Sequence, residues 1–132
     1  MVKIKFGSLR EIITGLNELM DKELPIKAAY WTGKLGKMIH HEFIAFEDIR
    51  IKIVQKYAVK NNKNEFVIES DEDNNKQEYK LADTDAFNKE YKELLNIEID
   101  IDFSPIPMSM FGDVKLSPIA MISLDKFIII DE

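Results

Sequence analysis

The chain contains no cysteine, which excludes disulfide bonds, thiolate chemistry and every metal site built on sulfur. It has only five glycines, and none of them stands in the spacing of a phosphate-binding loop. No apolar run approaches the roughly 20 residues that a membrane-spanning helix needs, and the first residues lack the apolar stretch of a signal peptide. We therefore expect a cytoplasmic protein that does not associate with membranes.

The two histidines stand side by side, as His40 and His41, and Glu42 follows them. A zinc-binding helix needs two histidines four residues apart with a catalytic glutamate between them. Neighbouring residues on a helix point about 100° apart, so His40 and His41 cannot both ligate one ion. We interpret them as solvated or interface residues and expect no metal, no cofactor and no catalytic set here.

Acidic residues form two further patterns that are similar to metal sites. Glu98, Asp100 and Asp102 alternate with apolar residues, which places their carboxylates on one face of a strand about 7 Å apart. A magnesium ion needs ligands about 2 Å away that converge on one point, so a site here would need help from elsewhere, for example Asp113. Residues 71–75 lack the glycine and the terminal glutamate of a calcium loop. We expect both segments to face solvent and the protein to be non-enzymatic.

Charge is distributed unevenly along a chain of net charge −6, which we interpret as a single domain over residues 1–132. The mainly helical half, residues 1–63, has a net charge of +5, and the acidic, β-rich half, residues 64–132, has one of −11. This asymmetry either favours self-association or is neutralised within the protomer. Eight basic residues lie along the helical half from Lys27 onward, but only one of them is the arginine that nucleic-acid contacts favour, so we do not expect nucleic-acid binding.

Residues 25–60 form the longest predicted element, a helix without an internal proline. A helix of about 35 residues spans roughly 50 Å, whereas a compact globule of this chain length has a diameter of about 35 Å. We therefore expect the helix to project, to bend or to pack against another chain. Gly33 and Gly36 mark the point where it either bends or approaches another helix closely. Its apolar residues recur at helical spacing: Ile39, Phe43, Phe46, Ile49, Ile53 and Tyr57.

The remaining pattern predicts an α+β fold in which the long helix, straight or bent, is combined with a preceding helix, a small antiparallel sheet and two short helices. A capping box of Ser8 and Glu11 begins the preceding helix, which ends near Glu23. The other predicted elements are a strand or extended arm at 2–6, a hairpin at 65–82, a helix capped by residues 83–85 that ends near Asn96, a strand at 97–103, a helix from Pro118 to about 123, and a strand or docked tail at 127–130.

Several aromatic and methionine side chains are of the kind that is enriched at protein interfaces. They would serve equally well as ordinary core residues. We select seven of them as candidates for a partner or oligomer interface: Tyr30, Trp31, Met38, Phe43, Phe46, Met110 and Phe111.

Two parts of the chain resemble a family of small proteins carried by phages and prophages of Gram-positive bacteria. One part is residues 87–99, followed by Ile106-Pro107 and by residues 116–118. The other is residues 24–27, which lead into the long helix that ends at Tyr57. The resemblance covers nearly the whole chain and implies a viral origin, but it carries no chemical signature from which residue roles follow.

These observations favour a phage-encoded, non-enzymatic protein-binding module that forms a homodimer through its long helix. We expect its partner to be a host or phage protein, with a host defence or nuclease system as the first target class to test. One alternative is a factor in virion assembly or morphogenesis. The other is a sponge for a small ligand such as a nucleotide, with a pocket between protomers near Tyr30, Trp31 and Phe111.

Overall fold

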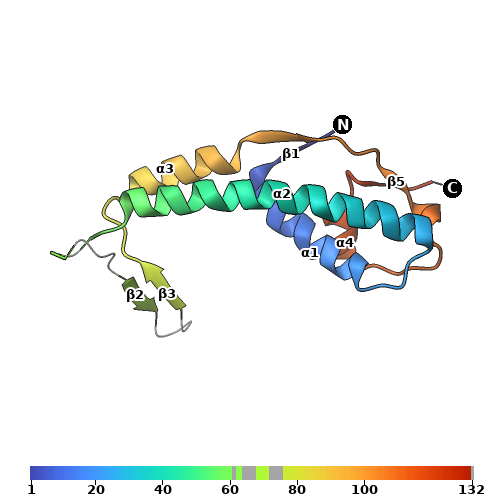
Figure 1. Ribbon diagram of the computed structural model, residues 1–132, viewed down its shortest axis with the longest axis horizontal. Helices are drawn as coiled ribbons and strands as arrows, with labels where there is room; N and C mark the ends of the chain where they lie inside the picture. Colours follow the sequence, from blue (N-terminus) through green and yellow to red (C-terminus); the bar gives the residue numbers. More distant parts are fainter. Residues whose placement is uncertain (61, 64–67, 72–75, 132) are drawn as a thin grey trace.

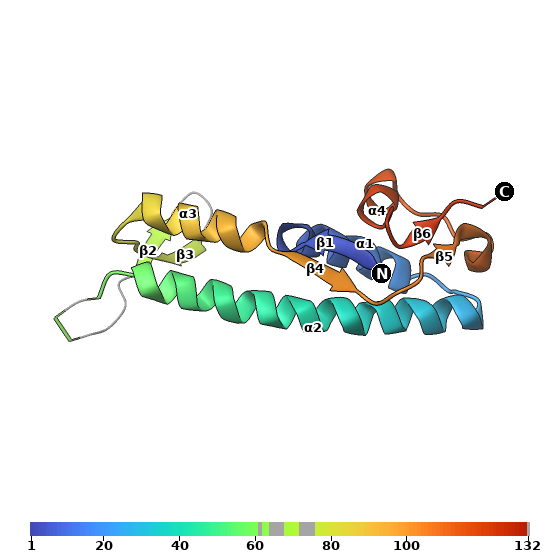
Figure 2. The same cartoon turned by 90° about the horizontal axis from the view of Figure 1, so that it is seen from above.

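A computed structural model describes residues 1–60, 62–63, 68–71 and 76–131. The fold is α+β and is organised along one central helix, α2 (Ile26–Tyr57). Figures 1 and 2 show an elongated molecule in which the other elements are spread along this helix. Helices α1 (Leu9–Met20) and α4 (Pro118–Ser123) lie beside its first half, and α3 (Thr84–Leu95) lies along its second half.

Helix α2 is an uninterrupted helix of 32 residues, or about 48 Å. It ends at Tyr57 rather than at residue 60, because the chain becomes extended there and pairs with residues 80–82. The Val59 amide donates to the Lys80 carbonyl, and the Ala82 amide donates to the Tyr57 carbonyl. The helix continues through both glycines. A Cβ added to Gly36 would lie 3.5 Å from the sulfur of Met20 in α1, so Gly36 marks a close helix contact and not a break.

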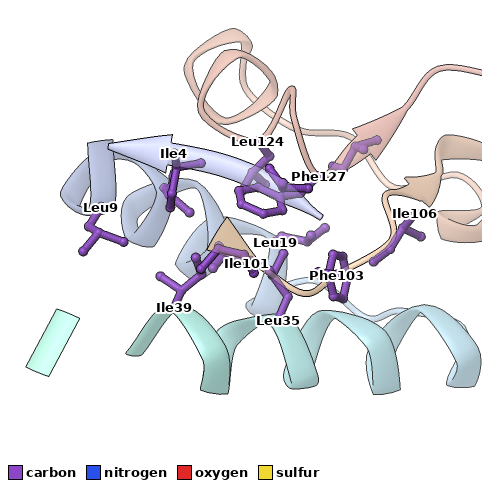
Figure 3. Close-up of a cluster of buried hydrophobic side chains, with 14 of the residues drawn as sticks. Ile4, Leu9, Leu19, Leu35, Ile39, Ile101, Phe103, Ile106, Leu124 and Phe127 are labelled. Atoms are coloured by element: carbon purple, nitrogen blue, oxygen red, sulfur yellow. The ribbon is translucent and has the colours of Figure 1, made fainter. Parts of the chain in front are cut away.

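One face of α2 is covered by the protomer itself. Figure 3 shows Leu35 and Ile39 of α2 below side chains from α1, from the strands and from the C-terminal segment. Near the other end of the helix the rings of Tyr57 and Phe87 meet edge to face, with their centroids 6.3 Å apart. Of the three expected outcomes, a bend is absent, because α2 continues as one helix; the chain spreads along it instead of forming a compact globule (Figure 1), so the length of the helix does not by itself require a second chain. The core face of α2 consists of Ala28, Thr32, Leu35, Ile39 and Phe46.

Strands β1 (Val2–Lys5) and β4 (Glu98–Ile101) form an antiparallel pair beside the place where α1 packs against α2. Strand β1 settles the choice between a strand and an arm at residues 2–6. The apolar side chains of both strands point inward and the charged ones face solvent, as the alternation predicts. Lysines of β1 lie opposite carboxylates of β4, which favours this register.

Two predicted helix caps are present and one is absent. Asp83 accepts a hydrogen bond from the amide of Ala86 at the start of α3, and Ser117 accepts one from the amide of Ala120 at the start of α4. Ser8 makes no such bond, because it belongs to the 3₁₀ turn η1 (Phe6–Ser8), where its backbone is already helical. The predicted capping box is therefore wrong, and α1 ends at Met20 instead of near residue 23.

The predicted hairpin is present as the antiparallel strands β2 (Ile68–Asp71) and β3 (Lys76–Tyr79); its predicted positions 65–67 and 72–75 lie outside the described residues. The sequence did not indicate the parallel pair of β5 (Ile106–Pro107) and β6 (Ile128–Ile129). The 3₁₀ helix η2 (Met108–Phe111) follows β5 directly.

Two glycines distinguish a packed helix face from an open one. A Cβ added to Gly15 of α1 would lie 3.1 Å from Leu124 Cγ and 3.1 Å from Ser123 Cβ, whereas one added to Gly33 of α2 would meet nothing within 4 Å. We predict that Gly33→Ala raises the free energy of unfolding by about 1 kcal/mol. Gly15→Ala should lower it by about 1 kcal/mol, because overpacking outweighs the gain in helix propensity.

Urea unfolding followed by circular dichroism measures both changes, and the wild-type chain is the common reference. Equal stabilisation by the two substitutions would contradict the close packing of α1 against the segment after α4.

Candidate protein-interaction surfaces

A pocket of about 260 Å³ lies between α2 and the segment that follows β4. The indole of Trp31 forms part of its wall and remains 38% exposed. This ring meets the Phe103 ring edge to face at 6.4 Å and the Tyr30 ring at 5.2 Å. The ammonium group of Lys34 lies 5.2 Å from the indole centroid, which is a cation–π contact. The pocket therefore combines aromatic walls with one cation.

The far wall of this pocket is held by the C-terminal part of the chain. Pro105 and Pro107 keep the segment after β4 extended, and the Ile106 amide donates to the Phe127 carbonyl at 2.8 Å. The carboxylate of Asp131 accepts hydrogen bonds from the Ser109 amide at 2.9 Å and from the Ser109 hydroxyl at 2.5 Å. These bonds lower the pKa of Asp131. The last residues of the chain thus fix η2, which carries one side of the pocket.

A second pocket, of about 350 Å³, continues the first along the boundary between α2 and β4. Met38 and Asp102 line both pockets, so we treat them as one surface and call it the α2–β4 groove. Its helix side presents Lys37 and His41, and its strand side presents acidic residues that include Asp100. Glu42 also lies on the helix side, so the groove has a helix wall of mixed charge and an acidic strand wall, with apolar residues between them.

The face of α2 opposite the core is the second candidate surface. Ile44 and Ile51 are 48% and 43% exposed, although isoleucine normally lies in protein interiors. They are seven residues apart and so lie on the same side of the helix, together with Tyr30, Lys37 and Asp48. We call this line of five residues the outer face of α2.

The structure separates the seven candidate interface residues into three groups. Trp31, Met38 and Met110 line the groove, and Tyr30 is exposed beside it. Phe43 is half-buried against the core. Phe46 and Phe111 are each only 2% exposed, so the protomer already covers them and they are not available to a partner. Their selection as interface residues is corrected: Phe46 belongs to the core face of α2, and the turn η2 directs Phe111 into the same core.

Ion pairs connect the helices that surround α2. The guanidinium of Arg50 donates to the Glu47 carboxylate at 2.8–3.1 Å, and Arg10 of α1 reaches the same group at 3.4 Å. The hydrogen bonds from Arg50, followed by the Arg10 contact, lower the pKa of Glu47. Lys56 of α2 lies 2.6 Å from Glu90 of α3, and this contact lowers the pKa of the Glu90 carboxyl. These shifted groups join one element to another and do not face either pocket.

Sequence reasoning missed most of the groove. Its strand wall comes from residues 100–107 and its helix wall from residues 31–42, so no local pattern connects the two. The prolines of the strand wall were the available signal, because alternating prolines indicate an extended segment that does not pair as an internal strand. The Glu47–Arg50 pair was recognisable from its spacing of three residues on a helix.

Within the described part of the chain, no three histidine or acidic side chains are grouped so as to hold a metal ion. Among the same residues, no helix combines the length and the apolar character needed to cross a membrane. Comparison of the chain with protein-family models, with curated proteins and with solved structures gave no match. The geometry therefore defines an elongated α+β protein with two candidate interaction surfaces, the α2–β4 groove and the outer face of α2.

Proposed function

We propose that the protein is a non-enzymatic protein-binding module that acts as a homodimer paired through the outer face of α2. The observation that carries this proposal is the exposure of Ile44 and Ile51 on a helix whose opposite face is already buried. Pairing with a second copy removes both side chains from water, and each is worth up to about 1.5–3 kcal/mol when fully buried.

The charges on the outer face favour an antiparallel arrangement. Lys37 precedes Ile44 and Asp48 follows it on the same side of the helix, and both charged residues are exposed. When two copies pair about a two-fold axis between residues 42 and 43, Lys37 of each copy meets Asp48 of the other, and the two Ile44 residues are offset by about 4.5 Å along the helix direction. A parallel arrangement would instead place like charges side by side.

The isoleucines of this face provide the first test. We predict that Ile44→Lys combined with Ile51→Lys converts a dimer into a monomer of 15.3 kDa, because each lysine would have to lose its hydration at the interface. Sedimentation velocity over a range of concentrations measures the mass. The matched control is Ile119→Lys with Ile122→Lys, which changes two exposed isoleucines of α4 and should leave the dimer intact. A wild-type chain that stays monomeric would refute the dimer.

The charge pattern provides the second test. We predict that Lys37→Glu or Asp48→Lys alone weakens self-association by about tenfold, because each creates two repulsive contacts across the axis. The double variant should restore the wild-type dissociation constant. Lys89→Glu on α3 changes the net charge equally and should have no effect. Failure of the double variant to recover would exclude the antiparallel pairing but not a dimer of another geometry.

For the target, we propose a protein of a host defence or nuclease system, with the protein acting as an inhibitor encoded by a phage. The row of exposed carboxylates on β4 supports this, since it offers negative charge at a regular spacing of about 7 Å, as nucleic-acid phosphates do. The resemblance to small phage proteins supports a viral origin.

We predict that the protein purified from host cells retains a host nuclease or defence protein, and that adding the protein lowers the activity of that partner. Mass spectrometry identifies the retained proteins with and without the other phage genes. Glu98→Gln, Asp100→Asn and Asp102→Asn together should abolish retention if the carboxylates mimic nucleic acid. Retention of virion proteins alone would favour a role in assembly instead.

A small-ligand sponge is the second candidate function, and the pocket beside Trp31 is the observation that favours it. Because this pocket lies within one protomer, Phe111 and a second copy are not needed to form it. Thermal unfolding in the presence of a panel of nucleotides tests this role. An unchanged midpoint across the panel would remove it.

A further inference from the structure

The two edges of the β1–β4 pair differ. The Phe6 amide donates to the Ile97 carbonyl at 3.0 Å, which continues the register of the two strands. In an antiparallel pair, every second pair of residues exchanges hydrogen bonds. Ile4 and Ile99 are therefore a hydrogen-bonded pair, and the backbone groups of Lys3 and Asp100 point away from each other. Lys3 thus presents its amide and carbonyl at the outer edge of β1, and Asp100 presents its own at the outer edge of β4.

The edge of β1 is partly covered by another segment of the chain. The Lys3 carbonyl accepts a hydrogen bond from the Lys126 ammonium group at 3.2 Å, which confirms the direction in which it points. On β4, the backbone amides of Glu98 and Asp100 donate no hydrogen bond to any residue that the structure describes, and their carbonyls accept none. Proteins usually protect exposed strand edges, because such edges pair with other chains. An edge left open beside a groove is therefore a candidate binding site.

The open edge borders the α2–β4 groove. Figure 2 shows β4 between β1 and α2. Asp100 and Ile101 line the groove opposite Met38 of α2, and the Trp31 pocket continues it past the end of the strand. A chain that lies beside β4 would thus have a row of backbone partners on one side and an apolar pocket for one of its side chains.

We propose that an extended segment of another protein binds here as an additional strand on β4. Only a polypeptide offers alternating donors and acceptors at the spacing of the Glu98 and Asp100 backbone groups, about 7 Å per repeat. This inference rests on the protein-binding role proposed above, and its surface borders the dimer face, with which it shares Lys37.

Charge defines the chemistry of that segment. Side chains of an added strand lie about 5 Å from those of β4, so alternate residues of the segment neighbour the exposed carboxylates of Glu98 and Asp100. On the opposite edge, Lys3 and Lys5 of β1 occupy the equivalent positions. Across the groove, α2 presents Lys37 and His41 together with the carboxylate of Glu42, so its charges partly offset one another, whereas the strand wall is acidic. The segment therefore alternates basic and apolar residues, with one large apolar side chain in the Trp31 pocket.

The probe for this site is a short peptide that alternates lysine with valine and carries one central phenylalanine. Fluorescence anisotropy measures its affinity, and amide hydrogen exchange by NMR locates it. We expect exchange of the Asp100 amide to slow on binding, while the Ile99 amide, already bonded to β1, changes little. An N-methyl group on each backbone nitrogen that faces β4 should abolish binding, whereas N-methylation of the alternate nitrogens should not.

Protein variants test the two walls. Trp31→Ala should weaken binding by about tenfold, and Ile119→Ala, which changes an exposed residue of α4 outside the groove, should not. Asp100→Lys with Asp102→Lys should reject the lysine peptide and accept one that alternates glutamate with valine. The dimer-face variant Ile44→Lys should bind the peptide as the wild type does, so failure of the dimer and failure of this site are distinguishable.

The proposal is overturned if the peptide does not bind, if both N-methylated peptides bind equally well, or if exchange of the Asp100 amide is unchanged in the complex. Binding that depends on Trp31 but not on the peptide backbone would likewise exclude strand addition and assign the pocket to a small apolar ligand.

Discussion

Burial of one face of α2 is the interaction on which the rest of this structure depends. Leu35 and Ile39 contribute to the core beneath the β1–β4 pair, and Phe46 extends it toward α3. Because α1, α3 and the β1–β4 pair pack on this side or on the flank of the helix, the molecule is elongated along it (Figure 1), and the buried apolar residues of the described part form one cluster. The same arrangement leaves the opposite face of α2 uncovered, and it forms a groove where β4 approaches the flank of the helix.

Charged side chains on the outer surfaces help to fix the strand register and the packing of the helices. Lys3 and Lys5 face acidic partners across the β1–β4 pair, so a shift of one residue would place lysines beside isoleucines and turn the apolar side chains outward. The ion pairs of Glu47 with Arg50 and Arg10, and of Glu90 with Lys56, join α2 to its neighbours. The carboxylates of β4 combine both roles, since they neighbour the lysines of β1 and also face solvent beside the groove.

Local signals predicted the local structure. The spacing of apolar residues gave the long helix, Asp83 and Ser117 gave two helix starts, and the alternation at residues 97–103 gave a strand with an acidic face. The capping box predicted at Ser8 was wrong, because the same sequence pattern occurs whether or not the backbone of the serine is already helical. These errors and successes concern contacts within a few residues.

The pairing of segments far apart in the chain could not be predicted from the sequence, for physical reasons. The β1–β4 and β5–β6 pairings join segments far apart in the chain, and two-residue strands such as β6 carry no periodicity. Phe46 and Trp31 are both aromatic and lie on the same helix, but one is core and the other lines a pocket, which depends on what packs against each. The assumption of a compact globule was the largest error, since it converted the length of α2 into a need for a partner.

The elongated shape also affects how the mass of this protein is measured in solution. A rod has a larger Stokes radius than a sphere of equal mass, so a single chain leaves a gel-filtration column early, at a volume where globular standards indicate a heavier species. Apparent masses calibrated on such standards will therefore overstate the number of chains in a particle. Light scattering or sedimentation equilibrium, which weigh the particle independently of its friction, report the stoichiometry directly.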